Sequence, residues 1–268
     1  MVQLLEPLVP DPGALLARTN PIAKIGAAAA FMVAAFVTID LLTPSVLLGF
    51  ELALLPATGL RPQVLLSRLW PLATAAVGVG VLNALLAGEP SGELIFRLGP
   101  LVLTTGSLLT GVALAVRLLA IALAGVLAFV ATDPTDFADG LIQQLRISPR
   151  IAIGSLAGLR TLPILAEEWQ TMGLAQRARG MEAGRSPIAA VRLVASRLMT
   201  LLVRAIRRGI RMATAMEARG FGAGDCRTVA RPQRMRGRDW GLLAGALLAS
   251  GAATATSAAL GSWRFLLS

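Results

Sequence analysis

Two arginines in matching sequence contexts are the residues of this chain with the most distinctive chemistry. Residues 174–184 and 214–224 align at a separation of 40 residues, and six of the eleven aligned positions are identical. The shared core is the tripeptide Ala-Arg-Gly, which occupies Ala178, Arg179 and Gly180 in the first copy and Ala218, Arg219 and Gly220 in the second. A guanidinium group offers a rigid fork of donors that binds a carboxylate through two parallel hydrogen bonds. We therefore predict that Arg179 and Arg219 bind carboxylates on a partner protein.

The residue types that most catalytic and metal sites need are missing from the sequence. It has no histidine, which removes the commonest general base and metal ligand, and its single cysteine, Cys226, cannot form an intrachain disulfide. Lys24 is the only lysine, and it does not belong to a Gly-x-x-x-x-Gly-Lys phosphate loop. We therefore expect no catalytic residues, no metal site, no cofactor and no ATP hydrolysis by the chain itself.

Each of the two arginines is predicted to lie at the C-terminal tip of a long helix. Ser148-Pro149 and Ser186-Pro187 pair an N-cap residue with proline at the first helical position, as Asp133-Pro134 does earlier in the chain. The glycine after each arginine supplies the left-handed residue that ends a helix, and a cation is favoured at that end of the helix dipole. One Arg-Gly helix end is ordinary, but two copies in register favour a functional pair.

The rest of the chain has the composition of an integral membrane protein. Of its 268 residues, 55% are hydrophobic and only 15% are charged, and the mean hydropathy is +0.71. Apolar runs near the length of a bilayer crossing predict about five transmembrane helices, of which the second is the weakest and the fourth is unusually long. These runs are Ile22–Ile39, Ser45–Leu60, Leu69–Ala87, Leu101–Ala131 and Trp240–Gly261. The predicted fold class is all-α: a polytopic membrane protein with long cytoplasmic amphipathic helices.

The positive charges predict the orientation and the domain organisation. The chain carries a net charge of +10, and 18 of its 25 basic residues lie between Arg146 and Arg238. Because cytoplasmic loops are enriched in Lys and Arg, this stretch is expected inside the cell, with the N-terminus inside and, for an odd helix count, the C-terminus outside. We expect N-terminal transmembrane helices in residues 1–131, a cytoplasmic region in residues 132–238 and a C-terminal transmembrane helix in residues 239–268.

Several other arginines allow more than one interpretation. In the second of the two long helices, apolar residues recur at helical spacing beside a stripe formed by Arg197, Arg204, Arg208 and Arg211. This stripe either rests on anionic lipid headgroups or contacts protein. Arg117, inside the fourth apolar run, either faces a partner, pairs with Glu51 or makes structural hydrogen bonds within the helix bundle.

The same motifs resemble the transmembrane T component of energy-coupling factor transporters. The resemblance is strongest from about Gly111 to Gly222 and is carried by the paired Ala-Arg-Gly tips, together with Thr132–Pro134, Leu159–Pro163 and Gln176–Gly180. It implies a multi-pass scaffold in a bacterial plasma membrane whose arginine tips dock into two ATP-binding cassette ATPase subunits. It also implies a separate, small substrate-binding membrane protein as a partner, and no nucleic acid.

Two other functions remain open at this point. A permease subunit of a conventional ATP-driven transporter would line the substrate path itself, but it usually exposes one coupling loop, whereas this chain has two tips. A scaffold that organises anionic lipids would need the positive charge of the helices but not the Arg-Gly ends.

Overall fold

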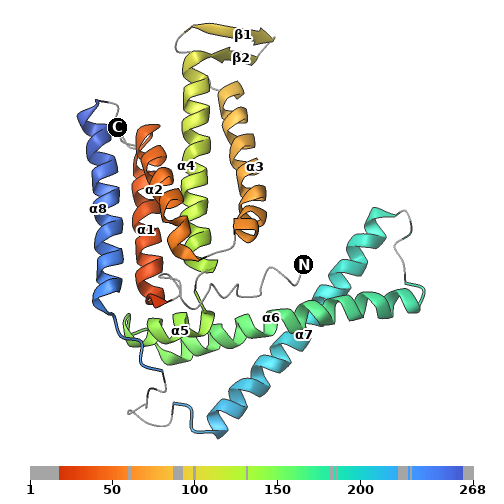
Figure 1. Cartoon of the computed structure of the whole chain (residues 1–268). Coiled ribbons are helices and arrows are strands. Elements are labelled where there is room, and N and C mark those ends of the chain that lie inside the picture. The colour runs from red at the N-terminus through yellow and green to blue at the C-terminus, as the bar shows by residue number, and fades with distance from the viewer. Residues whose placement is uncertain are drawn as a thin grey trace. The chain divides into compact units, whose positions relative to one another are not determined.

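The computed structural model is almost entirely helical. It describes residues 18–59, 62–86, 93–98, 101–130, 132–181, 184, 186–222, 229 and 231–261. Cys226 and the end of the second repeat copy at Gly224 lie outside the described residues. In chain order the elements are α1 (Pro21–Val37), α2 (Leu42–Thr58), α3 (Pro62–Leu86), β1 (Leu94–Leu98), β2 (Leu101–Thr104), α4 (Thr105–Val130), α5 (Pro134–Gln143), α6 (Pro149–Ala178), α7 (Pro187–Ala218) and α8 (Gly237–Ala259) (Figure 1).

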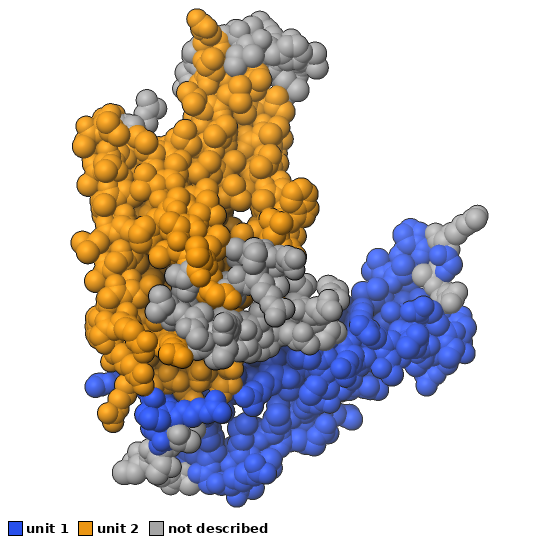
Figure 2. Space-filling model, in the orientation of Figure 1, with its two compact units in different colours: residues 1–6, 141–232 blue, residues 7–140, 233–268 orange. Residues whose placement is uncertain are grey.

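The chain divides into two compact units, which Figure 2 shows in different colours. Unit 1 comprises residues 1–6 and 141–232 and contains α6 and α7. Unit 2 comprises residues 7–140 and 233–268 and contains α1 to α4, most of α5, the two strands and α8. The C-terminal helix therefore belongs to the same unit as the N-terminal helices, although about a hundred residues separate them in sequence.

The helices of unit 2 have the length and composition of membrane spans. Three are long and apolar enough to cross a bilayer, namely residues Leu66–Leu86 of α3, all of α4 and all of α8. Helix α1 and residues Leu42–Pro56 of α2 are also apolar but shorter. Because a bilayer offers no hydrogen bonds to the backbone, helices that satisfy their own peptide groups suit this solvent. The predicted all-α polytopic membrane fold is confirmed.

The fourth apolar run begins as a strand, where the sequence predicted one long helix. Its first residues form β2, which pairs antiparallel with β1 so that Leu98 faces Leu101 and Arg97 faces Val102. A reciprocal cap then starts α4, because the Ser107 amide donates to Thr104 Oγ1 at 3.2 Å and the Thr104 amide donates to Ser107 Oγ at 3.0 Å. This cap explains why the helix begins at residue 105. The apolar run is longer than the helix because its first four residues belong to β2.

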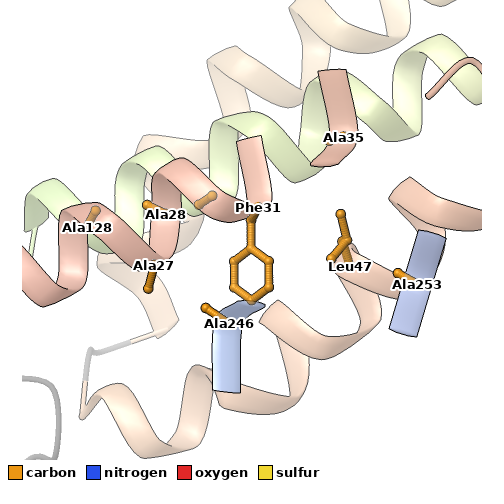
Figure 3. Packing of buried hydrophobic residues seen from close by; sticks show 9 residues of the cluster. Ala27, Ala28, Phe31, Ala35, Leu47, Ala128, Ala246 and Ala253 are labelled. Carbon is orange, nitrogen blue, oxygen red and sulfur yellow. The ribbon is translucent and has the colours of Figure 1, made fainter. Parts of the chain in front are cut away.

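Small side chains build the core of unit 2. Seven of the nine residues in its main buried cluster are alanines, and Phe31 of α1 and Leu47 of α2 fill the space between them (Figure 3). The alanines come from α1, α4 and α8. Such small residues let helix backbones approach closely, which is how helices pack where lipid removes the hydrophobic driving force.

Two polar contacts hold α8 alongside α1. Near the start of both helices, the backbone amide of Asn20 donates to Asp239 Oδ1 at 2.8 Å. At the other end, Ser257 Oγ donates to Asp40 Oδ2 at 2.6 Å. Burial raises the pKa of the Asp40 carboxyl, but hydrogen bonds from Ser257 and Thr43 outweigh it and lower this pKa below its usual value. Since one contact joins the starts of the two helices and the other joins their ends, α1 and α8 run parallel.

Arg117 contacts the bundle interior instead of Glu51. Its Nη2 donates to the backbone carbonyl of Thr38, and Asp40 is close enough to interact with it electrostatically. Of the interpretations that the sequence left open, structural hydrogen bonding within the bundle is therefore the one observed. Glu51 is 1% exposed, and its two carboxyl oxygens have no hydrogen-bond partner in the described part of the chain. It faces a cavity of about 60 Å³ whose lining includes Lys24 and Thr58.

Two glycines form a close contact between α3 and α4. A Cβ on Gly80 of α3 would lie 2.6 Å from the carbonyl oxygen of Gly111 in α4, and a Cβ on Gly111 would lie 2.5 Å from the carbonyl oxygen of Gly80. Neither position can hold a methyl group unless the two backbones separate. A Cβ on Gly78, two residues earlier in α3, would meet nothing within 4 Å.

We predict that Gly80→Ala destabilises the protein and Gly78→Ala does not. Both changes raise helix propensity by about 1 kcal/mol, so the pair differs only in the steric clash, and overpacking costs about 1–3 kcal/mol. The thermal midpoint of the purified protein in mild detergent, followed by circular dichroism, should fall by several degrees for Gly80→Ala alone. Equal midpoints for the two variants would contradict the close packing of α3 on α4.

Candidate functional site

The two long helices of unit 1 begin where the sequence predicts. Helix α7 starts at Pro187, and the Ser186 side chain caps it by accepting from the Ala189 amide at 3.4 Å. Helix α6 starts at Pro149, although the Ser148 side chain makes no capping hydrogen bond. Proline at the first helical position is common to both, and its fixed φ suits the first turn. At 30 and 32 residues, the helices extend about 45–48 Å.

Both helices end in the same backbone motif, and an arginine is the last residue before the turn. Arg179 and Arg219 are the C-cap residues, and Gly180 and Gly220 follow with φ of +72° and +79°. Within the α6 tip the Gly180 amide donates to the Arg177 carbonyl at 2.9 Å, and the Met181 amide donates to the Gln176 carbonyl at 3.0 Å. This is the Schellman arrangement, in which a left-handed glycine closes the helix.

The α7 tip repeats this geometry almost bond for bond. The Gly220 amide donates to the Glu217 carbonyl at 2.9 Å, and the Phe221 amide donates to the Met216 carbonyl at 3.0 Å. The 40-residue sequence repeat is therefore also a structural repeat. The prediction of two equivalent helix tips is confirmed at the level of the backbone.

The side chains of both tips are available to a partner. The structure places all six predicted site residues at the exposed ends of α6 and α7; they are Ala178, Arg179, Gly180, Ala218, Arg219 and Gly220. The ion pairs found among the described residues involve other arginines. The small alanine before each arginine keeps the tip narrow.

The structure does not bring the two arginines together. Helices α6 and α7 cross within unit 1, and their C-terminal ends lie on opposite sides of the crossing (Figure 1). A Cβ on Gly222, just after the α7 tip, would lie 3.4 Å from Nη2 of Arg150, which is at the start of α6. The α7 tip is thus at the opposite end of α6 from Arg179. The two arginines therefore lie at separate places on unit 1.

Most of the predicted arginine stripe of α7 contacts α6. Arg208 Nη2 donates to Glu168 Oε1 at 2.8 Å, and Arg204 Nη1 lies 3.9 Å from Glu168 Oε2. Arg197 donates through Nε to the Gln176 side chain, and its guanidinium carbon lies 5.9 Å from the ring centre of Trp169. Of the two interpretations that the sequence left open for these three residues, protein contact is therefore the one observed.

The apolar side of α7 remains exposed. The helix has no buried residue, and its exposed large side chains include Ile188, Val191, Leu202 and Ile210. Toward the start of α6 the two helices diverge around a groove of about 240 Å³. Small residues form much of its lining: Gly154, Ala157, Gly158, Gly209 and Ala213.

The residues of α6 that receive the α7 arginines were not predicted. Glu168, Trp169 and Gln176 lie on a helix with little amphipathic character, so no periodic pattern marks them. One signal was present: Glu168 and Arg208 are 40 residues apart, which is the separation of the repeat. Opposite charges at repeat-equivalent positions on two crossing helices predict a contact, but only once the crossing is known.

We predict that Gly220→Ala loosens the α7 tip. An L-residue in the left-handed region costs about 1–2 kcal/mol, so amide exchange at Phe221 should accelerate about 5- to 30-fold. Hydrogen–deuterium exchange with mass spectrometry measures this effect. Gly209→Ala, in the interior of α7 with nothing within 4 Å of the added Cβ, is the control. Gly220→Asn should have a smaller effect, because asparagine tolerates this conformation, and equal exchange in all three variants would contradict the tip geometry.

Comparison with known proteins agrees with the resemblance drawn from the tips. Residues 13–230 match the family described as cobalt transport protein, CbiQ. The chain is 31% identical over 252 residues to the energy-coupling factor transporter transmembrane protein EcfT of Bacillus selenitireducens, with 87% of each chain covered. It is 30% identical over 230 residues to EcfT of Thermosediminibacter oceani, covering 83% of this chain and 86% of the relative. EcfT of Bacillus subtilis is 28% identical over 233 residues.

The family match covers the apolar helices of unit 2 as far as α4, the crossed helices and both arginine tips. The relatives align over more than four-fifths of this chain. The chain therefore belongs to the CbiQ family of cobalt transport proteins, which are membrane transport components.

Proposed function

We propose that this chain is the membrane scaffold of an energy-coupling factor transporter and couples ATP hydrolysis by partner subunits to uptake of a vitamin, metal ion or other micronutrient. The single observation that carries the proposal is the pair of equivalent, exposed arginine tips. Each lies at the C-terminal end of its helix, and the two lie on opposite sides of the crossing of α6 and α7. The transmembrane proteins named among its relatives are components of such transporters.

In this proposal Arg179 and Arg219 each insert into a groove on a different ATP-binding cassette ATPase and pair with a carboxylate there. The chain itself does not hydrolyse ATP in the usual way, because it has no Gly-x-x-x-x-Gly-Lys phosphate-binding loop. Movement of the ATPases is transmitted through the rigid helices α6 and α7. A separate, small membrane protein binds the substrate, so substrate specificity lies outside this chain.

The proposed location is a bacterial plasma membrane, which the chain crosses several times with unit 1 on the cytoplasmic side. The arginine content of residues 146–238 supports this orientation, because positively charged loops stay inside. The parallel course of α1 and α8 also supports it. If α1, α2, α3 and α4 each cross the membrane once, the chain returns to the cytoplasm after α4. Helix α8 then starts inside, as α1 does, and ends outside.

We predict that Arg179→Ala and Arg219→Ala each weaken recovery of ATPase subunits with the affinity-tagged chain, and that the double variant abolishes it. Removing one partner of a buried charge pair costs about 2–5 kcal/mol, because the other charge remains buried without a partner. Arg→Lys at the same positions should recover only part of the loss, since an ammonium group lacks the fork of donors. Quantitative mass spectrometry after purification in mild detergent measures the bound ATPases, and an uptake assay follows transport.

The control for this experiment is Arg192→Ala with Arg207→Ala, which removes the same charge from exposed positions of α7. Arg197 and Arg204 do not serve as controls, because both contact α6. Attraction to anionic lipid is worth about 1 kcal/mol per residue, so the control should lose little ATPase. Equal losses in the two double variants, at equal membrane abundance, would favour the lipid-organising scaffold instead.

A second prediction concerns the side of the membrane on which unit 1 lies. In a Cys226→Ser background, the cysteine of an Ile188→Cys variant should react with an impermeant maleimide only after the cells are opened, because this residue is 79% exposed. Labelling of intact cells, normalised to labelling of opened cells, measures the orientation. Efficient labelling from outside would overturn both the orientation and ATPase docking at the tips.

A further inference from the structure

We propose that Glu168, Arg208 and Arg197 form an interhelical clasp that fixes the directions in which the two arginine tips point. These three residues would then be positioning residues for ATPase docking, although none of them touches an ATPase. The inference rests on the proposed function, because a fixed angle between the tips matters only if both tips must engage at once.

The central contact of the clasp is an ion pair that is largely shielded from water. Arg208 Nη2 donates to Glu168 Oε1 at 2.8 Å, and the two side chains are 28% and 22% exposed. Arg208 Nη1 is buried and has no hydrogen-bond partner among the described residues. Removing Glu168 would therefore leave a partly buried guanidinium beside α6 without its counter-charge, unlike the loss of an exposed surface pair.

The ion pair joins equivalent positions of the two repeat copies. Glu168 and Arg208 are 40 residues apart, as are Arg179 and Arg219. Each partner of the ion pair is thus 11 residues from the arginine at its own tip, or about 16 Å along the helix. We call residues 168–179 the α6 arm and residues 208–219 the α7 arm; both start at the ion pair and have equal length. A change in the angle between the helices therefore moves both tips by similar amounts.

A second contact holds the α6 arm. Arg197 of α7 donates to the side chain of Gln176, whose backbone carbonyl accepts the Met181 hydrogen bond that closes the α6 tip. Its guanidinium also lies over Trp169, and a Cβ on Gly173 would come within 3.1 Å of Arg197 Nη1. The absence of a side chain at Gly173 therefore leaves the space that Arg197 occupies between the crossing and the tip.

Spin-label distances between the two arms test the clasp directly. In the full chain, with Cys226→Ser, labels are placed at Leu174→Cys and Thr214→Cys, which are exposed and repeat-equivalent. Double electron–electron resonance in lipid nanodiscs should give one narrow distance distribution. Glu168→Ala should broaden this distribution and shift its maximum, whereas Glu167→Ala should leave it unchanged. Glu167 is the matched control because it is adjacent, exposed and of the same charge.

A charge exchange separates the ion pair from general damage to unit 1. The double variant Glu168→Arg with Arg208→Glu restores opposite charges across the crossing, so it should restore the narrow distribution that Glu168→Ala loses. If Glu168→Ala leaves the distances unchanged, or if the exchange fails to restore them, the clasp is overturned.

ATPase recovery, measured on the same samples, distinguishes this inference from the proposed function. We expect Glu168→Ala to lose ATPase severalfold with both tip arginines in place, and the charge exchange to regain it. Arg179→Ala with Arg219→Ala should abolish recovery while leaving the distances unchanged. Full recovery in that tip variant would overturn the proposed function alone. Full recovery in Glu168→Ala, despite broadened distances, would overturn the positioning role of the clasp alone.

Discussion

The left-handed backbone at Gly180 and Gly220 is the constraint on which the two tips depend. A helix end stays open to a partner only if the chain turns away immediately after the last residue, and a positive φ directly after the arginine produces this turn. Residues with a Cβ resist that conformation, so the backbone requires glycine, and in the proposed function the partner requires arginine. The two requirements fall on adjacent residues, which explains why the repeat retains both.

The two units meet different demands of their surroundings. In unit 2, alanine-rich contacts and the facing Gly80 and Gly111 bring helices together in a solvent that does not drive them to associate. In unit 1, α7 has no buried residue, and charged and polar side chains join it to α6. Unit 1 is thus held by a few directional contacts instead of a large core, which agrees with its proposed role of presenting fixed tips to other proteins.

Much of unit 1 was predictable because strong local signals mark its helix ends. Ser-Pro pairs and glycines delimit α6 and α7, and the predicted ends agree with the structure to within one residue. The start of α4 was not predictable from hydropathy, since a short apolar run such as Leu101–Thr104 reads equally well as strand or helix. The ion pair between Glu168 and Arg208 was also missed, because it depends on how two helices cross and not on spacing within either one.

The equal arms of α6 and α7 restrict how the chain can vary in length. Eleven residues make about three helical turns with roughly 20° to spare, so each tip arginine projects from nearly the same side of its helix as the Glu168 or Arg208 behind it. Inserting or deleting one residue between them would rotate the arginine by about 100° and move it by about 1.5 Å. Changes in length can therefore be absorbed before the crossing or after the glycine, but a change within an arm would turn its arginine away from the direction that the proposed docking needs.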